Sequence, residues 1–173
     1  MSHTSPVVGI LMGSDSDWPV MEDAAKTLDR FGVPCEVRVI SAHRRPDDCA
    51  EYARTAAARG LKVLIGGAGG AAHLAGVLAA HTSLPVVAVP VPTPLAGGLD
   101  SLLSMVQMPP GVPVATVGVG RSGNAALLAV QMLALADASL AERLHAYKRE
   151  LAEKGAAADH KLQEARRGLA TPG

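Results

Sequence analysis

The amino-acid sequence predicts an α/β fold, in which helices cover both faces of a parallel β-sheet. Short apolar runs rich in Val and Ile alternate with longer segments of helical periodicity along the 173 residues. Gly or Pro follows most of the apolar runs, as is usual where a strand ends in a loop. The length suits one domain with a substantial core, and we expect this domain to span residues 1–173.

Five strands are predicted, at residues 7–12, 35–40, 63–65, 86–91 and 114–119, and the apolar, β-branched run of the first suits a buried parallel strand. The segments between and after them predict helices, at about residues 17–31, 46–60, 71–80, 101–107, 124–136 and 139–154. Pro19 in the first turn and Gly32 just past the end support the bounds of the first helix. The core is expected to span about residues 7–137.

The last predicted helix is amphipathic, because Leu140, Leu144 and Tyr147 share one face. A helix that follows the last sheet layer often packs on a neighbouring subunit. From Gly155 onward the apolar face weakens, and we expect residues 155–173 to be frayed.

Five short strands favour the flavodoxin-like order 2-1-3-4-5 over a Rossmann dinucleotide fold. We therefore expect a three-layer, flavodoxin-like, doubly wound parallel sheet with a C-terminal helix. In this order strands 2 and 3 both flank strand 1, so the loops after strands 1, 2 and 3 meet at the carboxyl edge of the sheet. A functional site is expected at this edge.

The composition argues against a nucleic-acid-binding or secreted protein. Lys plus Arg and Asp plus Glu both number 16, and aromatic residues make up 2%, so the basic face and stacking side chains that bind nucleic acid are lacking. Cys35 and Cys49 form no CxxC pair, and residues 1–6 have neither the basic nor the apolar region of a signal peptide. No apolar run reaches the length of a membrane span. We expect a cytoplasmic protein with reduced thiols and no nucleic-acid or membrane partner.

The loop after the first strand, residues 13–19, joins a strand to a helix N-terminus. Its backbone amides and the hydroxyls of Ser14 and Ser16 can hold an anion such as a phosphate, but helix capping by Ser16 or Asp17 is an equally good interpretation. The loop matches neither the Walker A nor the GxGxxG motif. Because two aspartates beside a phosphate would repel it, at least one of them is expected to face ribose hydroxyls.

His43 and Arg44 follow the second strand, which we expect to be buried. An arginine can grip a phosphate bidentately, and an imidazole can exchange protons at neutral pH. The alternative is a capping histidine followed by solvated arginines. Only the neighbouring loops favour the functional interpretation.

The loop after the third strand, residues 66–73, is rich in glycine and alanine, which bring bare backbone close to a ligand. His73 is expected about one turn into the next helix, facing either the pocket or the core. A single histidine in an alanine-rich helix is more often structural than catalytic. No set of His, Asp or Glu has metal-ligand spacing, and no Ser lies in a GxSxG motif.

The loops together resemble those of the N5-carboxyaminoimidazole ribonucleotide mutase family. The three matching loop segments are Met12-Gly13-Ser14-Asp15-Ser16-Asp17-Trp18, Ser41-Ala42-His43-Arg44 and Gly67-Ala68-Gly69-Gly70-Ala71-Ala72-His73-Leu74. Later segments match in the family's order, among them Gly98-Leu99-Asp100-Ser101-Leu102 and Val106-Gln107-Met108-Pro109. The similarity runs from about residue 7 to residue 147, and an ordered set of this length is highly specific.

This resemblance implies a flavodoxin-like subunit of a homo-octamer, with active sites shared between neighbouring subunits. It implies that His43 is the general acid and base and that His73 is a second catalytic histidine. It also implies that the matched loops bind the substrate, through Ser14, Ser16, Asp17, Ala42, Arg44, Gly69, Gly70, Ala71 and Ala72. By charge, Ser14 and Arg44 are assigned to the phosphate and Asp17 to the ribose.

The reaction that the resemblance implies belongs to purine biosynthesis. The family moves a carboxylate from the exocyclic nitrogen to a ring carbon of the nucleotide through trapped carbon dioxide, and it uses no metal or organic cofactor. The sequence departs from the family at Arg45, where Thr is usual, and at Ala75, where Pro is usual. The alternatives are an aminoimidazole ribonucleotide carboxylase that uses carbon dioxide directly, in which Lys tends to follow the histidine, and a non-catalytic nucleotide-binding module.

Overall fold

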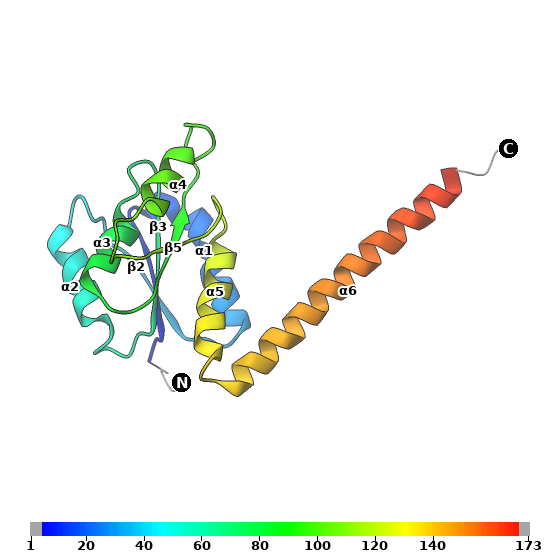
Figure 1. Ribbon diagram of the computed structural model, residues 1–173, viewed down its shortest axis with the longest axis horizontal. Coiled ribbons are helices and arrows are strands. Elements are labelled where there is room, and N and C mark those ends of the chain that lie inside the picture. The colour runs from blue at the N-terminus through cyan, green and yellow to red at the C-terminus, as the bar shows by residue number, and fades with distance from the viewer. Residues whose placement is uncertain (1–4, 170–173) are drawn as a thin grey trace. The chain divides into compact units, whose positions relative to one another are not determined.

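The computed structural model describes residues 5–169 and divides the chain into two compact units (Figure 1). One unit ends at Leu133 and holds the sheet, and the other begins at Ala134 and holds the last helix. The expectation of one domain over the whole chain stays a prediction.

The described residues form one five-stranded parallel sheet with the order β2-β1-β3-β4-β5, which confirms the predicted flavodoxin-like topology. The strands are β1 (Val8–Met12), β2 (Cys35–Val39), β3 (Val63–Ala68), β4 (Val86–Pro90) and β5 (Ala115–Thr116). Met12 pairs with Val39 of β2 on one side and with Gly67 of β3 on the other. The carboxyl ends of these three strands therefore lie at the same level, and the loops that follow them start side by side.

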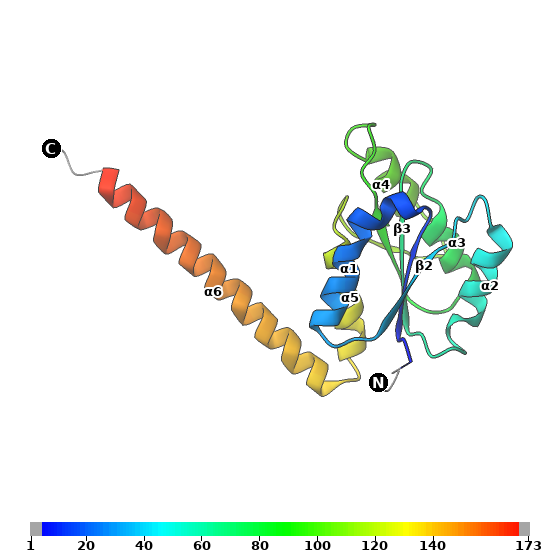
Figure 2. The same ribbon diagram turned by 180° about the vertical axis from the view of Figure 1, so that it is seen from behind.

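Helices cover both faces of the sheet, as Figures 1 and 2 show from opposite sides. The helical elements of this unit are η1 (Asp15–Asp17), α1 (Trp18–Arg30), α2 (Pro46–Ala56), α3 (Leu74–His81), α4 (Leu99–Val106) and α5 (Ser122–Ala134). In both views α1 and α5 lie on one face and α2 and α3 on the other. The expected three-layer arrangement is confirmed.

The second strand was expected to be buried, and this expectation is wrong. β2 forms an edge of the sheet, and its Val39 side chain is 44% exposed, whereas every residue of β1, β3 and β4 is buried. The predicted order 2-1-3-4-5 already leaves strand 2 with a neighbour on one side alone, and Glu36 and Arg38 alternate with valines along it. Such alternation is typical of a strand that is only half buried.

The third strand is longer than expected, because it continues through Gly66 and Gly67 to Ala68. A Cβ atom on Gly67 would lie 2.2 Å from Sδ of Met21 in α1. A Cβ atom on Gly66 would lie 3.2 Å from Cα of Ala75 in α3. These two glycines therefore let helices pack closely on opposite faces of the sheet. The predicted role, close approach of the backbone to a ligand, does not apply to them.

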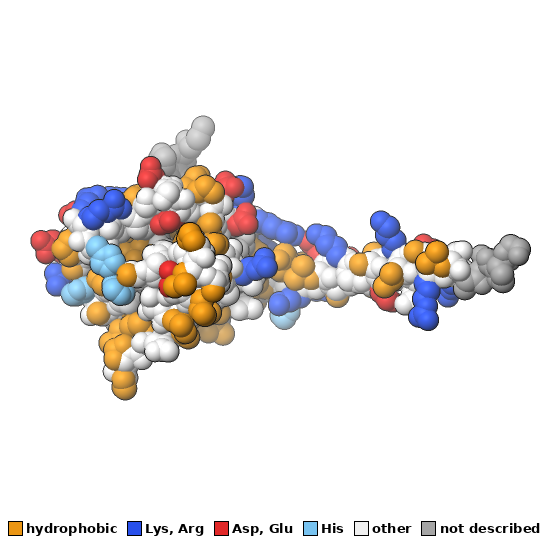
Figure 3. Space-filling view, turned by 90° about the horizontal axis from the view of Figure 1, so that it is seen from above, with side chains coloured by type: hydrophobic (Ala, Val, Ile, Leu, Met, Phe, Trp, Pro, Cys, Tyr) orange, Lys and Arg blue, Asp and Glu red, His pale blue; other side chains and the backbone are white. Residues whose placement is uncertain are grey.

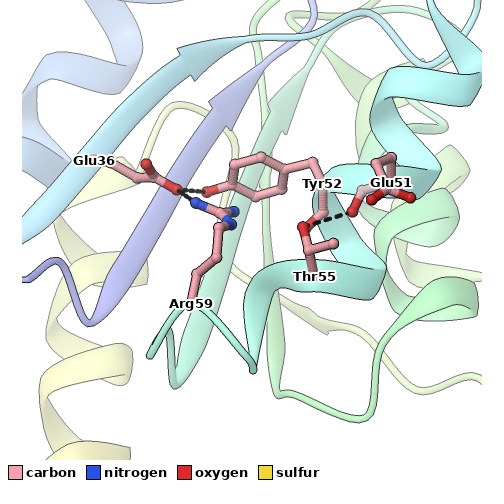
Figure 4. A network of polar contacts seen from close by, with 5 residues as sticks. All are labelled: Glu36, Glu51, Tyr52, Thr55 and Arg59. Carbon is pink, nitrogen blue, oxygen red and sulfur yellow. Dashed lines mark hydrogen bonds and ion pairs between the residues drawn. The ribbon is translucent and has the colours of Figure 1, made fainter.

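A polar network joins the edge strand to α2 (Figure 4). The Tyr52 hydroxyl donates a hydrogen bond of 2.7 Å to Oε1 of Glu36, and Nη1 of Arg59 donates one of 2.6 Å to the same oxygen. The guanidinium carbon of Arg59 also lies 4.5 Å from the centre of the Tyr52 ring. Burial raises the pKa of Glu36, but the hydrogen bonds from Tyr52 and Arg59 outweigh burial and leave that pKa below its ordinary value.

The second unit holds α6 (Ala138–Leu169), which continues well beyond the expected end near residue 154. The prediction of a frayed tail from Gly155 is thus wrong as far as Leu169, and residues 170–173 lie outside the described part of the chain. Ala, Glu, Gln, Lys and Arg dominate residues 156–167, and their helical propensity outweighs the single Gly155. The Asp137 carboxylate caps the helix by accepting a 3.0 Å hydrogen bond from the Leu140 amide. No helix within residues 5–169 is both long and apolar enough to cross a bilayer.

Candidate active site

A cavity of about 450 Å³ opens at the carboxyl edge of the sheet, where the loops after β1, β2 and β3 converge. Its lining residues are Gly13, Ser14, Asp17, Ser41, Ala42, His43, Arg44, Ala68, Gly69, Ala71, His73 and Leu74. Figure 3 looks onto this end of the molecule and shows histidine side chains at the surface. A cavity thus lies at the edge where the functional site is expected, and its role stays a prediction.

The loop after β1 is a capping box around Ser14. The Ser14 hydroxyl oxygen accepts a 3.3 Å hydrogen bond from the Ser16 amide, and Oδ2 of Asp17 accepts one of 3.2 Å from the Ser14 amide. The predicted helix capping is thus present, but the cap residue is Ser14 and not Ser16 or Asp17. Because Ser14 and Asp17 also line the cavity, the cap holds both side chains at its wall.

Asp17 lines the cavity with a carboxyl group whose pKa is raised. Burial raises the pKa of Asp17 above its ordinary value, and hydrogen bonds with the backbone of Ser14 and Gly13 offset the rise only in part. The positive charge of Arg44 acts in the same direction as these hydrogen bonds. A partly desolvated carboxyl group of this kind suits acceptance of hydrogen bonds from ligand hydroxyls better than contact with an anion.

Arg44 bridges the first two loops. Its Nη2 atom donates a 2.8 Å hydrogen bond to the carbonyl oxygen of Gly13, and its amide donates one of 3.3 Å to the Ser41 hydroxyl. A second cavity of about 330 Å³ shares Gly13, Ser14, Ser41 and Arg44 with the first. The guanidinium group therefore lies at the boundary of both cavities, where it can reach an anion held by the loop after β1.

His43 and His73 form a pair inside the cavity, although 30 positions separate them in the sequence. Nε2 of His43 lies 2.8 Å from Nδ1 of His73, and the two rings stand at 87° to one another. A hydrogen bond at this distance needs a proton on one of the two nitrogens, so the tautomer of each ring constrains that of the other. The pair can thus carry a proton and hold an imidazole in one orientation.

His73 does not lie one turn into its helix. It is the N-cap residue of α3, because the turns at Gly70 and Ala71 precede the helix and delay its start to Leu74. This later start places the imidazole at the cavity and not against the core. The prediction left both orientations open, and the helix boundary selects the pocket.

Not all predicted site residues line the cavity. Ser14, Asp17, Ala42, His43, Arg44, Gly69, Ala71 and His73 do so. The three that do not are Ser16, which bonds to Ser14, Gly70, which bonds to α4, and Ala72, which is 1% exposed within the core cluster. The sequence analysis missed four lining residues, Gly13, Ser41, Ala68 and Leu74. Each is a neighbour of a predicted residue, and chain adjacency is the signal that would have found them.

Among residues 5–169, no group of three or more His, Cys, Asp or Glu side chains is arranged to hold a metal ion. The chemical resources of the cavity are therefore an imidazole pair, one guanidinium group, one desolvated carboxyl group, hydroxyl groups and small apolar walls. Such a set suits acid–base chemistry on a small anionic ligand.

Fold and cavity together define a flavodoxin-like α/β protein with a candidate small-molecule site at the switch point of the sheet. The sequence profile of the AIR carboxylase family matches residues 7–154, and the chain belongs to this family.

Individual relatives agree with the family. The N5-carboxyaminoimidazole ribonucleotide mutase of Mycobacterium tuberculosis (strain CDC 1551 / Oshkosh) is 61% identical over 158 residues, which cover 91% of each chain. The mutase of the same name from Pyrococcus abyssi is 58% identical over 146 residues, 84% of each chain. A crystal structure of PurE from Treponema denticola superimposes with a TM-score of 0.82 at 32% identity, covering 91% of this chain and 98% of that one.

Proposed function

We propose that this protein is an N5-carboxyaminoimidazole ribonucleotide mutase of purine biosynthesis, which forms 4-carboxyaminoimidazole ribonucleotide. The observation that carries the proposal is the pairing of His43 with His73, 2.8 Å apart in a cavity that Arg44 also lines, in a chain of the AIR carboxylase family. The imidazole pair supplies a proton carrier, and the guanidinium group supplies an anchor for a phosphorylated substrate.

The loops after β1 and β2 bind the nucleotide in this proposal. We assign the phosphate to Arg44 and the Ser14 hydroxyl, since both line the two adjoining cavities. We assign the ribose hydroxyls to Asp17, whose carboxylate can accept hydrogen bonds from them.

The proton exchange falls to His43. As the C–N bond to the carboxylate breaks, its electron pair stays on nitrogen, carbon dioxide leaves, and the protonated imidazole gives its proton to that nitrogen. The ring carbon then forms a bond to carbon dioxide, and its own proton passes to the neutral imidazole, which restores both the aromatic ring and the starting state of the histidine. We assign the exchange to Nδ1 of His43, because Nε2 contacts His73.

Carbon dioxide must stay in the cavity between the two steps. Ala42, Gly69 and Ala71 line the cavity beside the histidines and offer no polar side chain to hold water there. A wall of this kind keeps the released gas close to the ring carbon and limits competing hydration. We expect no metal or organic cofactor to take part.

We further propose a cytoplasmic homo-octamer. Large apolar side chains of α4 and the loop before it are exposed, namely Leu95, Leu99, Leu103 and Val106. Figure 3, which looks down on this end of the molecule, shows hydrophobic side chains on its surface. A patch of this kind is typical of a surface covered by another subunit. Sedimentation equilibrium should give eight times the chain mass of 17.7 kDa, and a monomer or dimer would contradict the octamer.

One assay separates the candidate functions. Purified protein is offered either the N-carboxylated nucleotide or aminoimidazole ribonucleotide with bicarbonate, and the ring-carboxylated product is followed. Rapid turnover of the first substrate alone supports the mutase. Rapid turnover of the second alone supports a direct carboxylase. Tight nucleotide binding without turnover would leave a non-catalytic binding module.

A further inference from the structure

Ser101 in α4 is a fully buried polar residue, with 0% of its surface exposed. Its hydroxyl donates a 2.8 Å hydrogen bond to the carbonyl oxygen of Val91 and accepts one of 2.9 Å from the amide of Gly70. Val91 directly follows β4, and Gly70 lies in the loop between β3 and α3. One side chain therefore joins α4, the end of β4 and the glycine-rich loop.

Ser104, one turn further along α4, reaches the other polar group of the same residue. Its hydroxyl lies 3.2 Å from the carbonyl oxygen of Gly70 and 2.8 Å from that of Asp100, and it can donate to either. Ser101 thus binds the amide of Gly70, and the carbonyl of Gly70 lies within hydrogen-bond distance of Ser104. Gly70 has a φ of 68°, a left-handed conformation that side chains rarely adopt, and the two contacts hold it there.

The helix that carries these serines is itself anchored. The Thr93 hydroxyl donates a 2.6 Å hydrogen bond to Oδ1 of Asp100, and the Ser101 amide donates one of 2.9 Å to the same oxygen. The hydrogen bond from Thr93 and the backbone contacts hold the pKa of Asp100 below its ordinary value, so this acceptor stays ionised. The position of Ser101 is therefore set independently of the loop that it holds.

The loop held in this way forms one wall of the cavity. Gly69 and Ala71, the neighbours of Gly70, line the cavity, and His73 follows two residues later. No residue of α4 belongs to the lining. We propose that Ser101, supported by Ser104, is a positioning residue that acts through Gly70 to hold His73 against His43. This inference rests on the proposed function for its kinetic consequence.

The test compares Ser101→Ala with the wild type and with Ser122→Ala. Ser122 is a matched control, because it is also 0% exposed and its hydroxyl donates to a single backbone carbonyl, that of Val20. We expect Ser101→Ala to lower kcat at least tenfold while the Kd for the nucleotide changes less than threefold, since a small misplacement of a catalytic group costs rate more than binding. Ser101→Thr, which keeps the hydroxyl, should recover most of the rate, and Ser122→Ala should stay within twofold.

A crystal structure of the Ser101→Ala variant gives a readout independent of turnover. We expect the distance between Nε2 of His43 and Nδ1 of His73 to exceed about 3.5 Å, where a hydrogen bond is lost. A distance that stays near the wild-type 2.8 Å would overturn the inference. An unchanged kcat in an active enzyme, or an equal loss of rate in Ser122→Ala, would overturn it as well.

Two outcomes separate this inference from the proposed function. If the wild-type protein turns over neither substrate, the proposed function fails, while the crystallographic distance still decides whether Ser101 positions His73. If Ser101→Ala does not fold, Ser104→Ala takes its place under the same criteria. It removes the hydroxyl contacts to the Gly70 and Asp100 carbonyls at a partly buried position and leaves both hydrogen bonds of Ser101 in place.

Discussion

Replacement of His43 by asparagine separates a proton carrier from a structural histidine. The imidazole makes one hydrogen bond, of 2.8 Å to His73, at a position that is largely open to solvent. Asparagine is too short to keep this contact and cannot exchange a proton, but it is polar and fits the exposed loop. The folded state therefore loses at most one hydrogen bond, which contributes about 0.5–1.5 kcal/mol.

The loss of activity should be much larger than this loss of stability. General acid–base catalysis contributes roughly 10²- to 10⁴-fold, or about 2.7–5.4 kcal/mol of transition-state stabilisation. We expect His43→Asn to lower kcat by at least 10²-fold, with a nearly unchanged Kd for the nucleotide and a small decrease in melting temperature.

Turnover of the N-carboxylated nucleotide, nucleotide binding by calorimetry and thermal unfolding measure the three quantities. His81→Asn is the matched control, because His81 ends α3 at the opposite end from His73 and does not line the cavity. A His43→Asn variant with a rate close to that of the wild type would refute the assignment of the proton exchange. A loss of binding in proportion to the loss of rate would show instead that His43 anchors the substrate.

The remaining predictions concern binding and stability. Arg44→Ala should raise KM at least tenfold with a smaller effect on kcat, because a charge-assisted hydrogen bond to phosphate contributes about 1.5–3 kcal/mol; steady-state kinetics would show an unchanged KM if the phosphate lies elsewhere. Gly67→Ala should destabilise the protein by about 1–3 kcal/mol in denaturant unfolding, because the new Cβ would lie 2.2 Å from Sδ of Met21. Gly155→Ala should instead stabilise α6, because no atom lies within 4 Å of the new Cβ. Glu36→Gln should remove a pH-dependent part of the stability. A carboxyl group with a lowered pKa stabilises the folded state at pH values above its ordinary pKa of 4.5. This contribution is lost as the pH falls through the lowered pKa. Unfolding curves of equal pH dependence in the Glu36→Gln variant and the wild type would contradict this.

The strand and helix pattern was largely predictable, and the errors have local causes. The helix after β3 begins at Leu74 because tight turns at Gly70 and Ala71 precede it, and a glycine-rich run does not reveal where such turns stop. β3 runs through Gly66 and Gly67 because both flanking strands pair with it, a neighbour effect that outweighs the low strand propensity of glycine.

Most of the predicted site residues line one cavity for a related reason. Parallel pairing brings the carboxyl ends of β1, β2 and β3 to one level, so residues in the loops after these strands, such as Ser14, His43 and Gly69, come together. Ser101 could not be found in this way. Its hydroxyl reaches Gly70 from a helix that follows β4, and its signal in the sequence is that of a helix cap.

The sequence by itself determined the fold class and the chemistry available to this protein. Apolar periodicity is a local property that hydrophobic burial converts into strands and helices, and residue type decides which groups can carry a proton or a charge. The tertiary structure alone decided that His43 and His73 share a hydrogen bond and that Gly66 and Gly67 face helices. These features depend on distances between segments far apart in the chain, which pairing and packing set together and no single segment encodes.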